Sequence, residues 1–202
     1  MTKTLAPLQI YFIRHGETDW TLSGQHTGRT DLPLTARGEA MARGLATALQ
    51  GIRFSRVLSS PRLRARSTCS LAGFSDPSVQ LEPDLAEWDY GAYEGLRTAE
   101  IHQRQPSWNV WDDGCPGGET PAGISARADR LIASLCEQVS GKVIAFSHGQ
   151  FGRVLAARWI GLPVSQGQHF AISPASISIL SFETAHPLRR VISMWNSSAR
   201  SD

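Results

Sequence analysis

The sequence is poor in cysteine, and its cysteines lie far apart. There are three, Cys69, Cys115 and Cys136, and no pair has the two-residue spacing typical of redox or metal-binding thiols. An odd number in a chain of 202 residues argues against a disulfide framework. We therefore expect reduced thiols and a cytoplasmic protein.

Long apolar segments are missing as well. No stretch approaches the roughly 18 consecutive apolar residues of a membrane-spanning helix. The first nine residues hold one lysine and a proline ahead of the short apolar run 10–13, without the apolar core or cleavage site of a secretion signal. A membrane is therefore not expected among the partners.

A large excess of one charge is also lacking. The formal net charge is +2, so the overall balance favours neither nucleic acid nor a membrane surface as a partner. The positive charge is unevenly distributed, however, because residues 53–66 contain five arginines and no acid. Such a run is usually a solvated helix face, but it also attracts anions.

Length and periodicity indicate one α/β domain. Short apolar strands alternate with amphipathic helices, a pattern typical of a largely parallel sheet with helices on both faces. We expect a single domain over 1–202, built as a three-layer α/β/α sandwich whose last strands form an antiparallel edge. The predicted strands are 8–13, 57–58, 143–146, 176–182 and 190–194, and the predicted helices are 35–51, 60–72, 98–103, 120–139 and 149–161. Pro61 is expected in the first turn of its helix.

Polar clusters follow the first three predicted strands, at residues 14–18, 59–64 and 147–149. Ligands of open α/β sheets bind at the carboxyl ends of strands, so these clusters are expected to meet in one crevice. Helices that begin there present N–H groups and the positive ends of their dipoles. Two histidines and two arginines in such a place suit a phosphate, whereas a metal ion would favour more carboxylates nearby.

The first cluster resembles a known signature. Arg14-His15-Gly16-Glu17-Thr18 is similar to that of the histidine phosphatase superfamily, which includes the cofactor-dependent phosphoglycerate mutases. The similarity covers about residues 8–160 and continues at family spacing through Thr27-Gly28, 31–35, Ser60 with Arg64-Ala65, Glu87 with Tyr90-Gly91, and His148-Gly149.

This resemblance implies a phosphatase with a phosphohistidine intermediate and a phosphoglycerate mutase-like fold. His15 would be the nucleophile, and its second ring nitrogen would be held by a hydrogen bond. His148 would donate to the phosphoryl oxygens. Glu87 would protonate the leaving group and later activate water.

The resemblance also implies a phosphate clamp made of protein groups. Arg14 and Arg64 would grip the phosphoryl oxygens with their planar guanidinium groups, and Thr27 and Gly28 complete the predicted phosphate-binding set. Phosphoryl transfer depends mainly on positioning and charge stabilisation, which these groups supply. We expect no metal and no other cofactor, and a small phosphorylated substrate as the partner.

More specific similarity points to one branch of the superfamily. Segments 60–66, 87–95 and 108–115 resemble the sedoheptulose-1,7-bisphosphatase branch, which implies a sugar phosphate as substrate. Arg62 and Trp111 are the candidate substrate-binding residues. Packing is the competing interpretation for Trp111, since an indole buries a large apolar area wherever it lies. The remaining histidines are interpreted as structural: His26, His102, His169 and His186.

Two other functions stay open. The mutases usually carry Asn where this chain has Thr21, and a longer central insertion with extra basic residues. Here the segment 87–119 contains only two arginines among more acids, which argues against a mutase. A non-catalytic phospho-ligand-binding module would keep the arginines but would not need Glu87. The sequence does not fix the oligomeric state, and a homodimer stays open.

Overall fold

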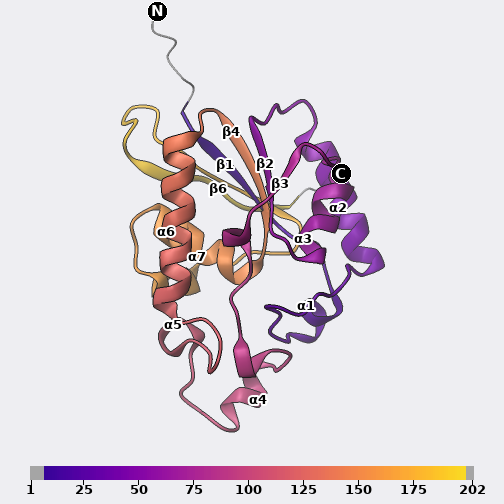
Figure 1. Ribbon diagram of the computed structural model, residues 1–202, viewed down its shortest axis with the longest axis vertical. Helices are drawn as coiled ribbons and strands as arrows, with labels where there is room; N and C mark the ends of the chain where they lie inside the picture. Colours follow the sequence, from indigo (N-terminus) through magenta and orange to yellow (C-terminus); the bar gives the residue numbers. More distant parts are fainter. Residues whose placement is uncertain (1–6, 199–202) are drawn as a thin grey trace, which may run out of the picture.

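Six strands form one mixed sheet at the centre of the structure (Figure 1). The computed structural model describes residues 7–198. The strands lie in the order β3-β2-β4-β1-β5-β6 and span Gln9–Arg14 (β1), Arg56–Ser59 (β2), Val79–Leu81 (β3), Lys142–Ser147 (β4), Ser176–Phe182 (β5) and Arg190–Ser198 (β6). Strands β3, β2, β4 and β1 are parallel, whereas β5 is antiparallel to both of its neighbours. The predicted antiparallel edge is confirmed as the β5–β6 hairpin.

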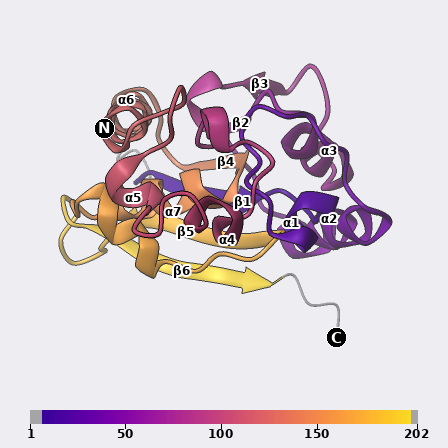
Figure 2. The ribbon, with the colours of Figure 1, turned by 90° about the horizontal axis from the view of Figure 1, so that it is seen from below.

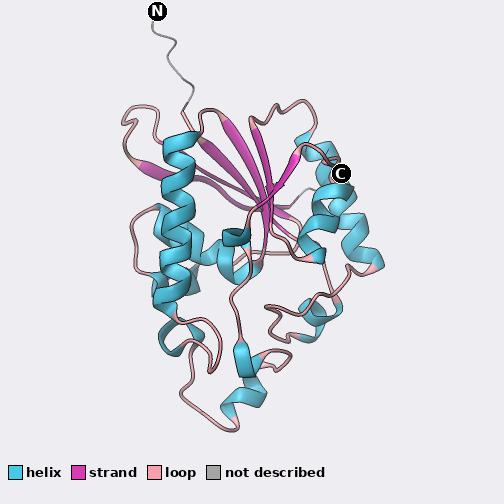
Figure 3. Cartoon of the chain, in the orientation of Figure 1, coloured by secondary structure: helices cyan, strands magenta, loops and turns pink. Residues whose placement is uncertain are grey.

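Helices cover both faces of the sheet, which confirms the three-layer sandwich (Figure 3). One face carries α2 (Ala36–Leu49) and α3 (Leu63–Leu71), and the other carries α6 (Pro121–Gln138) and α7 (Gly149–Trp159). Shorter elements gather beyond the carboxyl ends of the parallel strands, the end that Figure 2 shows. They include α1 (Asp19–Ser23), α4 (Thr98–His102), α5 (Val110–Asp113) and the 3-10 turns Pro83–Leu85, Gly91–Tyr93 and Val164–His169.

Two apolar cores separate the three layers. Ile13 and Phe146 belong to the core under α2 and α3. Their chain neighbours Phe12 and Ala145 belong to the core under α6 and α7. Because both faces are covered, the central strands are continuously apolar instead of alternating with polar residues. Within residues 7–198, no helix combines the length and the apolar character needed to cross a membrane.

The helix starts follow local rules, with one correction. Thr35 caps α2, because its side chain accepts a hydrogen bond from the Gly38 N–H. The helix predicted from residue 60 begins instead at Leu63, so Pro61 precedes the first turn. The reason lies in two distant contacts. Asp31 accepts from the Leu63 N–H at 2.9 Å, and the Ser60 hydroxyl is engaged by a histidine described below.

Candidate active site

The three polar clusters meet where the central parallel strands end. The parallel register places Arg14 of β1 beside Ser147 of β4, so the next residues, His15 and His148, follow adjacent strands. Their rings lie edge to face with centroids 5.2 Å apart. Ser60 follows β2, which pairs with the other side of β4. The structure therefore brings together the residues that the sequence places at separate strand ends.

His15 is held with one ring nitrogen fixed. Its Nδ1 lies 2.7 Å from the Gly16 carbonyl oxygen, so Nδ1 carries the proton and donates. Nε2 is consequently the nitrogen with a free lone pair. The side chain is only 4% exposed. Glycine is needed at position 16, because a Cβ there would lie 2.5 Å from the Gly38 carbonyl oxygen of α2.

His148 precedes the first turn of α7 and is fully buried. Its Nε2 lies 2.7 Å from the Ser60 hydroxyl, which explains why Ser60 stays outside the following helix. Its Nδ1 is buried without a partner. His148 therefore presents an unsatisfied nitrogen inside the site.

Arg64 is completely buried and held by backbone carbonyls. Its Nη1 donates to Thr30 O at 2.9 Å, and its Nη2 donates to Thr27 O and Gly28 O at 2.9 and 3.1 Å. Thr27 and Gly28, predicted to bind phosphate, hold this arginine with their carbonyl oxygens. The Gly28 N–H is donated to Glu94, and Thr27 also lines the pocket.

Arg14 is anchored on the other side of the site. Its Nη1 donates to the Ile172 carbonyl oxygen at 2.6 Å. Its guanidinium group packs on the start of α7, where a Cβ at Gly149 would come within 3.2 Å of Arg14 Cζ and Nε. The glycine after His148 thus makes room for the arginine before His15.

Unpartnered nitrogens gather around the two histidines. Within residues 7–198, the buried side-chain N and O atoms without a hydrogen-bond partner are Arg14 Nε, Arg62 Nε, Arg64 Nε and His148 Nδ1. A buried polar group left unsatisfied costs about 1–3 kcal/mol, so four of them at one place indicate a ligand that accepts hydrogen bonds. Arg62, predicted to bind substrate, is half-buried and belongs to this set. An oxyanion such as phosphate is the matching ligand.

Burial controls the charge of both histidines. Desolvation, followed by the charge of Arg64, lowers the pKa of His15 and of His148 well below the ordinary value of 6.5. Arg14 lowers the pKa of His15 further. Both rings are therefore neutral at neutral pH, which keeps the lone pair of His15 Nε2 available.

These shifts predict acid-sensitive stability. In the unfolded chain both histidines gain protons near pH 6.5, whereas in the folded protein they stay neutral to lower pH. Their contribution is complete above about pH 6.5 and is lost as pH falls below it, at up to about 1.4 kcal/mol per pH unit for each histidine. Thermal melts between pH 8 and 5 should show a smaller pH dependence for His148→Asn than for wild type. His186→Asn, in an exposed turn, is the control. An unchanged slope in His148→Asn would contradict the assignment.

Glu87 belongs to a loop, and its carboxylate is bound by backbone N–H groups at the start of α7. Its Oε1 accepts from Phe151 N at 2.8 Å and from Trp88 N at 2.9 Å, and its Oε2 accepts from Gln150 N at 3.0 Å. The helix N-terminus suits a carboxylate there. Glu87 lines the same pocket as His15.

Arg127 fixes the backbone that carries Glu87. Its Nη1 donates to Asp84 O and Ala86 O, both at 2.7 Å. It also forms a salt bridge of 2.8 Å with Glu119, where both side chains are largely buried. Sequence reasoning missed this pair, because the two residues look like ordinary charges on a helix and in a loop.

A pocket of about 350 Å³ opens above His15. Its wall comes from elements outside the sandwich, including Trp20, Thr21, Gln25, His26, Tyr90 and Thr98, together with Gln150 and Arg153 of α7. His26, interpreted as structural from the sequence, faces this pocket and stacks on Tyr90 with centroids 4.5 Å apart. Arg153 was also missed, although it lies one helical turn after Gly149 and Gln150 and therefore on the same face of α7.

Trp111, predicted to bind substrate, is not among the residues that line this pocket. Its side chain is 6% exposed and packs edge to face on Trp88 at 5.7 Å. The guanidinium group of Arg153 lies over the Trp111 ring, 4.8 Å from its centroid. These contacts favour the packing interpretation, and they connect Trp111 to the pocket through Arg153.

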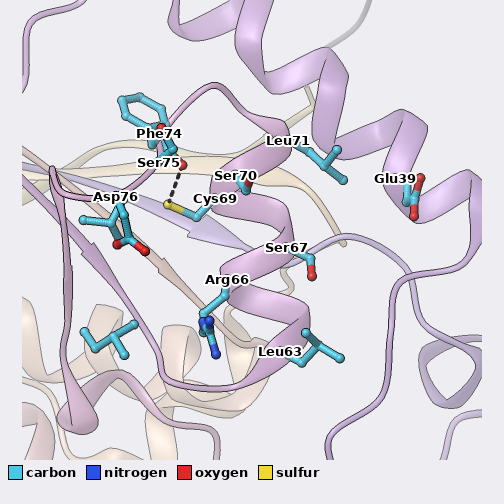
Figure 4. A pocket seen from close by; sticks show the side chains of 12 residues that line it. Glu39, Leu63, Arg66, Ser67, Cys69, Ser70, Leu71, Phe74, Ser75 and Asp76 are labelled. Carbon is cyan, nitrogen blue, oxygen red and sulfur yellow. Dashed lines mark hydrogen bonds between the residues drawn. The ribbon is translucent and has the colours of Figure 1, made fainter.

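A larger cavity, about 590 Å³, lies along α3 at the sheet edge (Figure 4). Its lining mixes leucines, serines, Phe74, Glu39 and Asp76, and includes neither His15 nor His148. It therefore lacks the groups for phosphoryl transfer. Within residues 7–198, no three His, Cys, Asp or Glu side chains are grouped as metal ligands.

The comparisons with known proteins agree with this geometry. The family model of the histidine phosphatase superfamily (branch 1) matches residues 10–197. The chain belongs to this superfamily. Its fold is phosphoglycerate mutase-like, and it is a phosphoric monoester hydrolase, a histidine phosphatase that acts on phosphomonoesters.

Individual relatives support the same family. The chain is 41% identical over 186 residues to an acid phosphatase of Mycobacterium tuberculosis, covering 91% of this chain and 90% of that protein. It is 39% identical to sedoheptulose 1,7-bisphosphatase of Saccharomyces cerevisiae, covering 76% of this chain and 68% of that protein. The solved structure of an open reading frame product from Mycobacterium tuberculosis has a TM-score of 0.88 at 38% identity, covering 95% of this chain and 98% of that one.

Proposed function

We propose that this phosphatase transfers the phosphoryl group of a small sugar phosphate to His15 Nε2 and then to water. The observation that carries the proposal is the set of four unpartnered buried nitrogens from His148 and from the arginines near the two histidines, Arg14, Arg62 and Arg64. They provide donors for the phosphoryl oxygens at the place where negative charge must be stabilised.

In the first step, His15 Nε2 attacks phosphorus while the bond from phosphorus to the ester oxygen breaks. The arginines and His148 hold the phosphoryl oxygens in place. The ester oxygen leaves as an alkoxide and takes a proton from Glu87. The N–H groups of α7 then hold the resulting carboxylate.

In the second step, the Glu87 carboxylate takes a proton from water, and the water oxygen attacks the phosphohistidine. The bond from His15 Nε2 to phosphorus breaks, so the ring returns to its starting state. Inorganic phosphate leaves, and Glu87 is protonated again for the next cycle.

The lining of the pocket supports a hydroxylated substrate. Thr21, His26, Thr98 and Gln150 offer neutral hydrogen-bonding groups that suit sugar hydroxyls. Arg153 adds a positive charge in the same wall, which suits a second anionic group such as another phosphate. The likeness to a sedoheptulose 1,7-bisphosphatase agrees with this substrate class.

We also propose that the chain works as one catalytic domain in the cytoplasm. Strands from both ends of the sequence, β1 and β6, belong to one sheet, which favours a single domain. All three cysteines are free, which suits a reducing compartment.

Phosphate release should continue in full with a strong chelator present, because protein groups supply the positive charge. The assay compares sugar monophosphates, sugar bisphosphates, phosphoglycerates and nucleotides, with and without EDTA. We expect the highest kcat/KM among the sugar phosphates and no change with EDTA. Loss of activity that a divalent ion restores would reject the metal-free mechanism. An isomerised ester in place of free phosphate would identify a mutase.

A further inference from the structure

The loop of residues 27–30 grips Arg64 from one side. The carbonyl oxygens of Thr27, Gly28 and Thr30 accept from Arg64 Nη1 and Nη2 at 2.9–3.1 Å. With both terminal nitrogens bound to carbonyls, Nε is left without a partner beside the histidines. The direction in which Arg64 presents this nitrogen therefore depends on where the loop lies.

A carboxylate holds the same loop from the other side. Glu94 Oε1 accepts from Gly28 N at 2.8 Å and from Thr30 N at 3.0 Å, and Oε2 lies 3.0 Å from Gly28 N. The loop backbone thus points its carbonyl oxygens toward the Arg64 guanidinium group and its N–H groups toward the Glu94 carboxylate. Position 28 must be glycine for this approach, because a Cβ there would lie 2.8 Å from Glu94 Oε2 and 2.5 Å from Trp88 O.

We infer that Glu94 is a positioning residue that sets the orientation of Arg64 through the 27–30 loop. Arg64 is a phosphoryl clamp only if the proposed function holds, so the inference rests on that proposal. Glu94 lies outside the set of side chains that line the pocket, and its carboxylate is occupied by the loop N–H groups. Glu94 therefore influences phosphate binding through Arg64, without contacting the phosphate itself.

The arrangement makes Arg64 a fixed group instead of a flexible one. A catalytic side chain has to be held within about 0.5 Å of its working geometry by its surroundings. Three carbonyl oxygens fix the position of Arg64. The loop that carries these carbonyls is itself fixed by two charge-assisted hydrogen bonds to Glu94. Without Glu94 the loop N–H groups of Gly28 and Thr30 would be left unsatisfied.

The central test is Glu94→Gln with inorganic phosphate as the probe. The amide removes the negative charge and turns an NH₂ group toward backbone N–H donors. We expect phosphate to bind about tenfold more weakly by isothermal titration calorimetry, in line with the loss of charge-assisted bonds. The values of kcat/KM should fall equally for a sugar phosphate and for p-nitrophenyl phosphate, since both need the clamp.

Asp89→Asn is the matched control. Asp89 joins the same two segments through a salt bridge of 2.7 Å to the exposed Arg29, without touching the loop N–H groups that Glu94 holds. Asn still accepts from Gly91 N, as Asp89 does at 3.1 Å. This variant should keep phosphate affinity within about twofold, the small effect typical of an exposed ion pair.

A double-mutant cycle with Arg64→Lys separates positioning from general loosening. If Glu94 acts through Arg64, Glu94→Gln should have almost no further effect on phosphate affinity in the Arg64→Lys background. Should Glu94→Gln fail to fold, Glu94→Asp replaces it, because its shorter side chain keeps the charge but cannot reach both N–H groups.

Unchanged phosphate affinity in the Glu94 variant would overturn the inference. So would additive effects of the two substitutions on phosphate affinity in the double mutant. A larger loss of kcat/KM for the sugar phosphate than for p-nitrophenyl phosphate would also overturn it, because it would make Glu94 a proton donor. Phosphate binding does not require turnover. If wild type binds phosphate but His15 is never phosphorylated, the proposed function is wrong, but phosphate binding by the variants still tests the role of Glu94.

Discussion

The His15→Ala variant should lose turnover by roughly 10⁴-fold or more, as expected when a covalent nucleophile is removed. His15 shares its pocket with His26 and Glu87, and its ring packs edge to face on His148, which also engages the Ser60 hydroxyl. None of these is placed to replace the missing nitrogen. The measurement is single-turnover and steady-state phosphate release, with thermal melting to show that the variant folds.

The intermediate itself gives a second readout. Wild type quenched in acid-free denaturant after mixing with labelled substrate should carry acid-labile, base-stable phosphate, and His15→Ala should carry none. His186→Ala, on the exposed β5–β6 turn, is the control and should label like wild type. The covalent route is wrong if wild type never becomes labelled, or if His15→Ala keeps a tenth of the rate.

The Glu87→Gln variant should lose kcat/KM by about 10²–10⁴ for a sugar phosphate, the usual span for general acid–base catalysis. A sugar alkoxide is a poor leaving group and needs the proton. A nitrophenolate leaves without one, so the loss should be much smaller for p-nitrophenyl phosphate. The comparison must use kcat/KM, because kcat can report the dephosphorylation step, in which Glu87 assists water with either substrate.

Equal losses for the two substrates would contradict the role of Glu87 as proton donor and indicate that it orients the start of α7. The other acids of this stretch are poor replacements. Glu87 lines the pocket that contains His15, whereas neither Asp89 nor Glu94 does. The structure thus makes the Glu87 experiment decisive for the identity of the donor.

Hydrophobic periodicity, together with residues that cap helices and form turns, was enough to predict the sandwich. Strands β1 and β4 contain continuous apolar runs, and α2 and α6 begin at threonine caps. Strand β3 has three residues, α5 has four and α1 has five, which is too short for a repeat to show. Helix α4 was nevertheless predicted, over 98–103, and spans Thr98–His102, whereas the four-residue α5 was not predicted.

Site residues were predictable where they follow strands, and less so where contacts come from distant loops. His15, His148 and Arg64 each sit directly after a strand or at a helix start, so their convergence follows from parallel topology. The part played by Gly28 depends on Arg64 and Glu94, which are 36 and 66 residues away along the chain. Likewise, nothing near Trp111 in the sequence indicates that Arg153 would cover its ring.

The short elements beyond the sheet have a consequence for how such enzymes diversify. The groups that handle phosphorus stand on strand ends and helix starts, which the two apolar cores hold rigid. The wall that meets the rest of the substrate includes Trp20, Thr21, Gln25 and Thr98, none of which belongs to those cores. Substitutions in that wall can therefore accumulate at small cost to folding, and selection can exchange one alcohol for another while the chemistry stays unchanged.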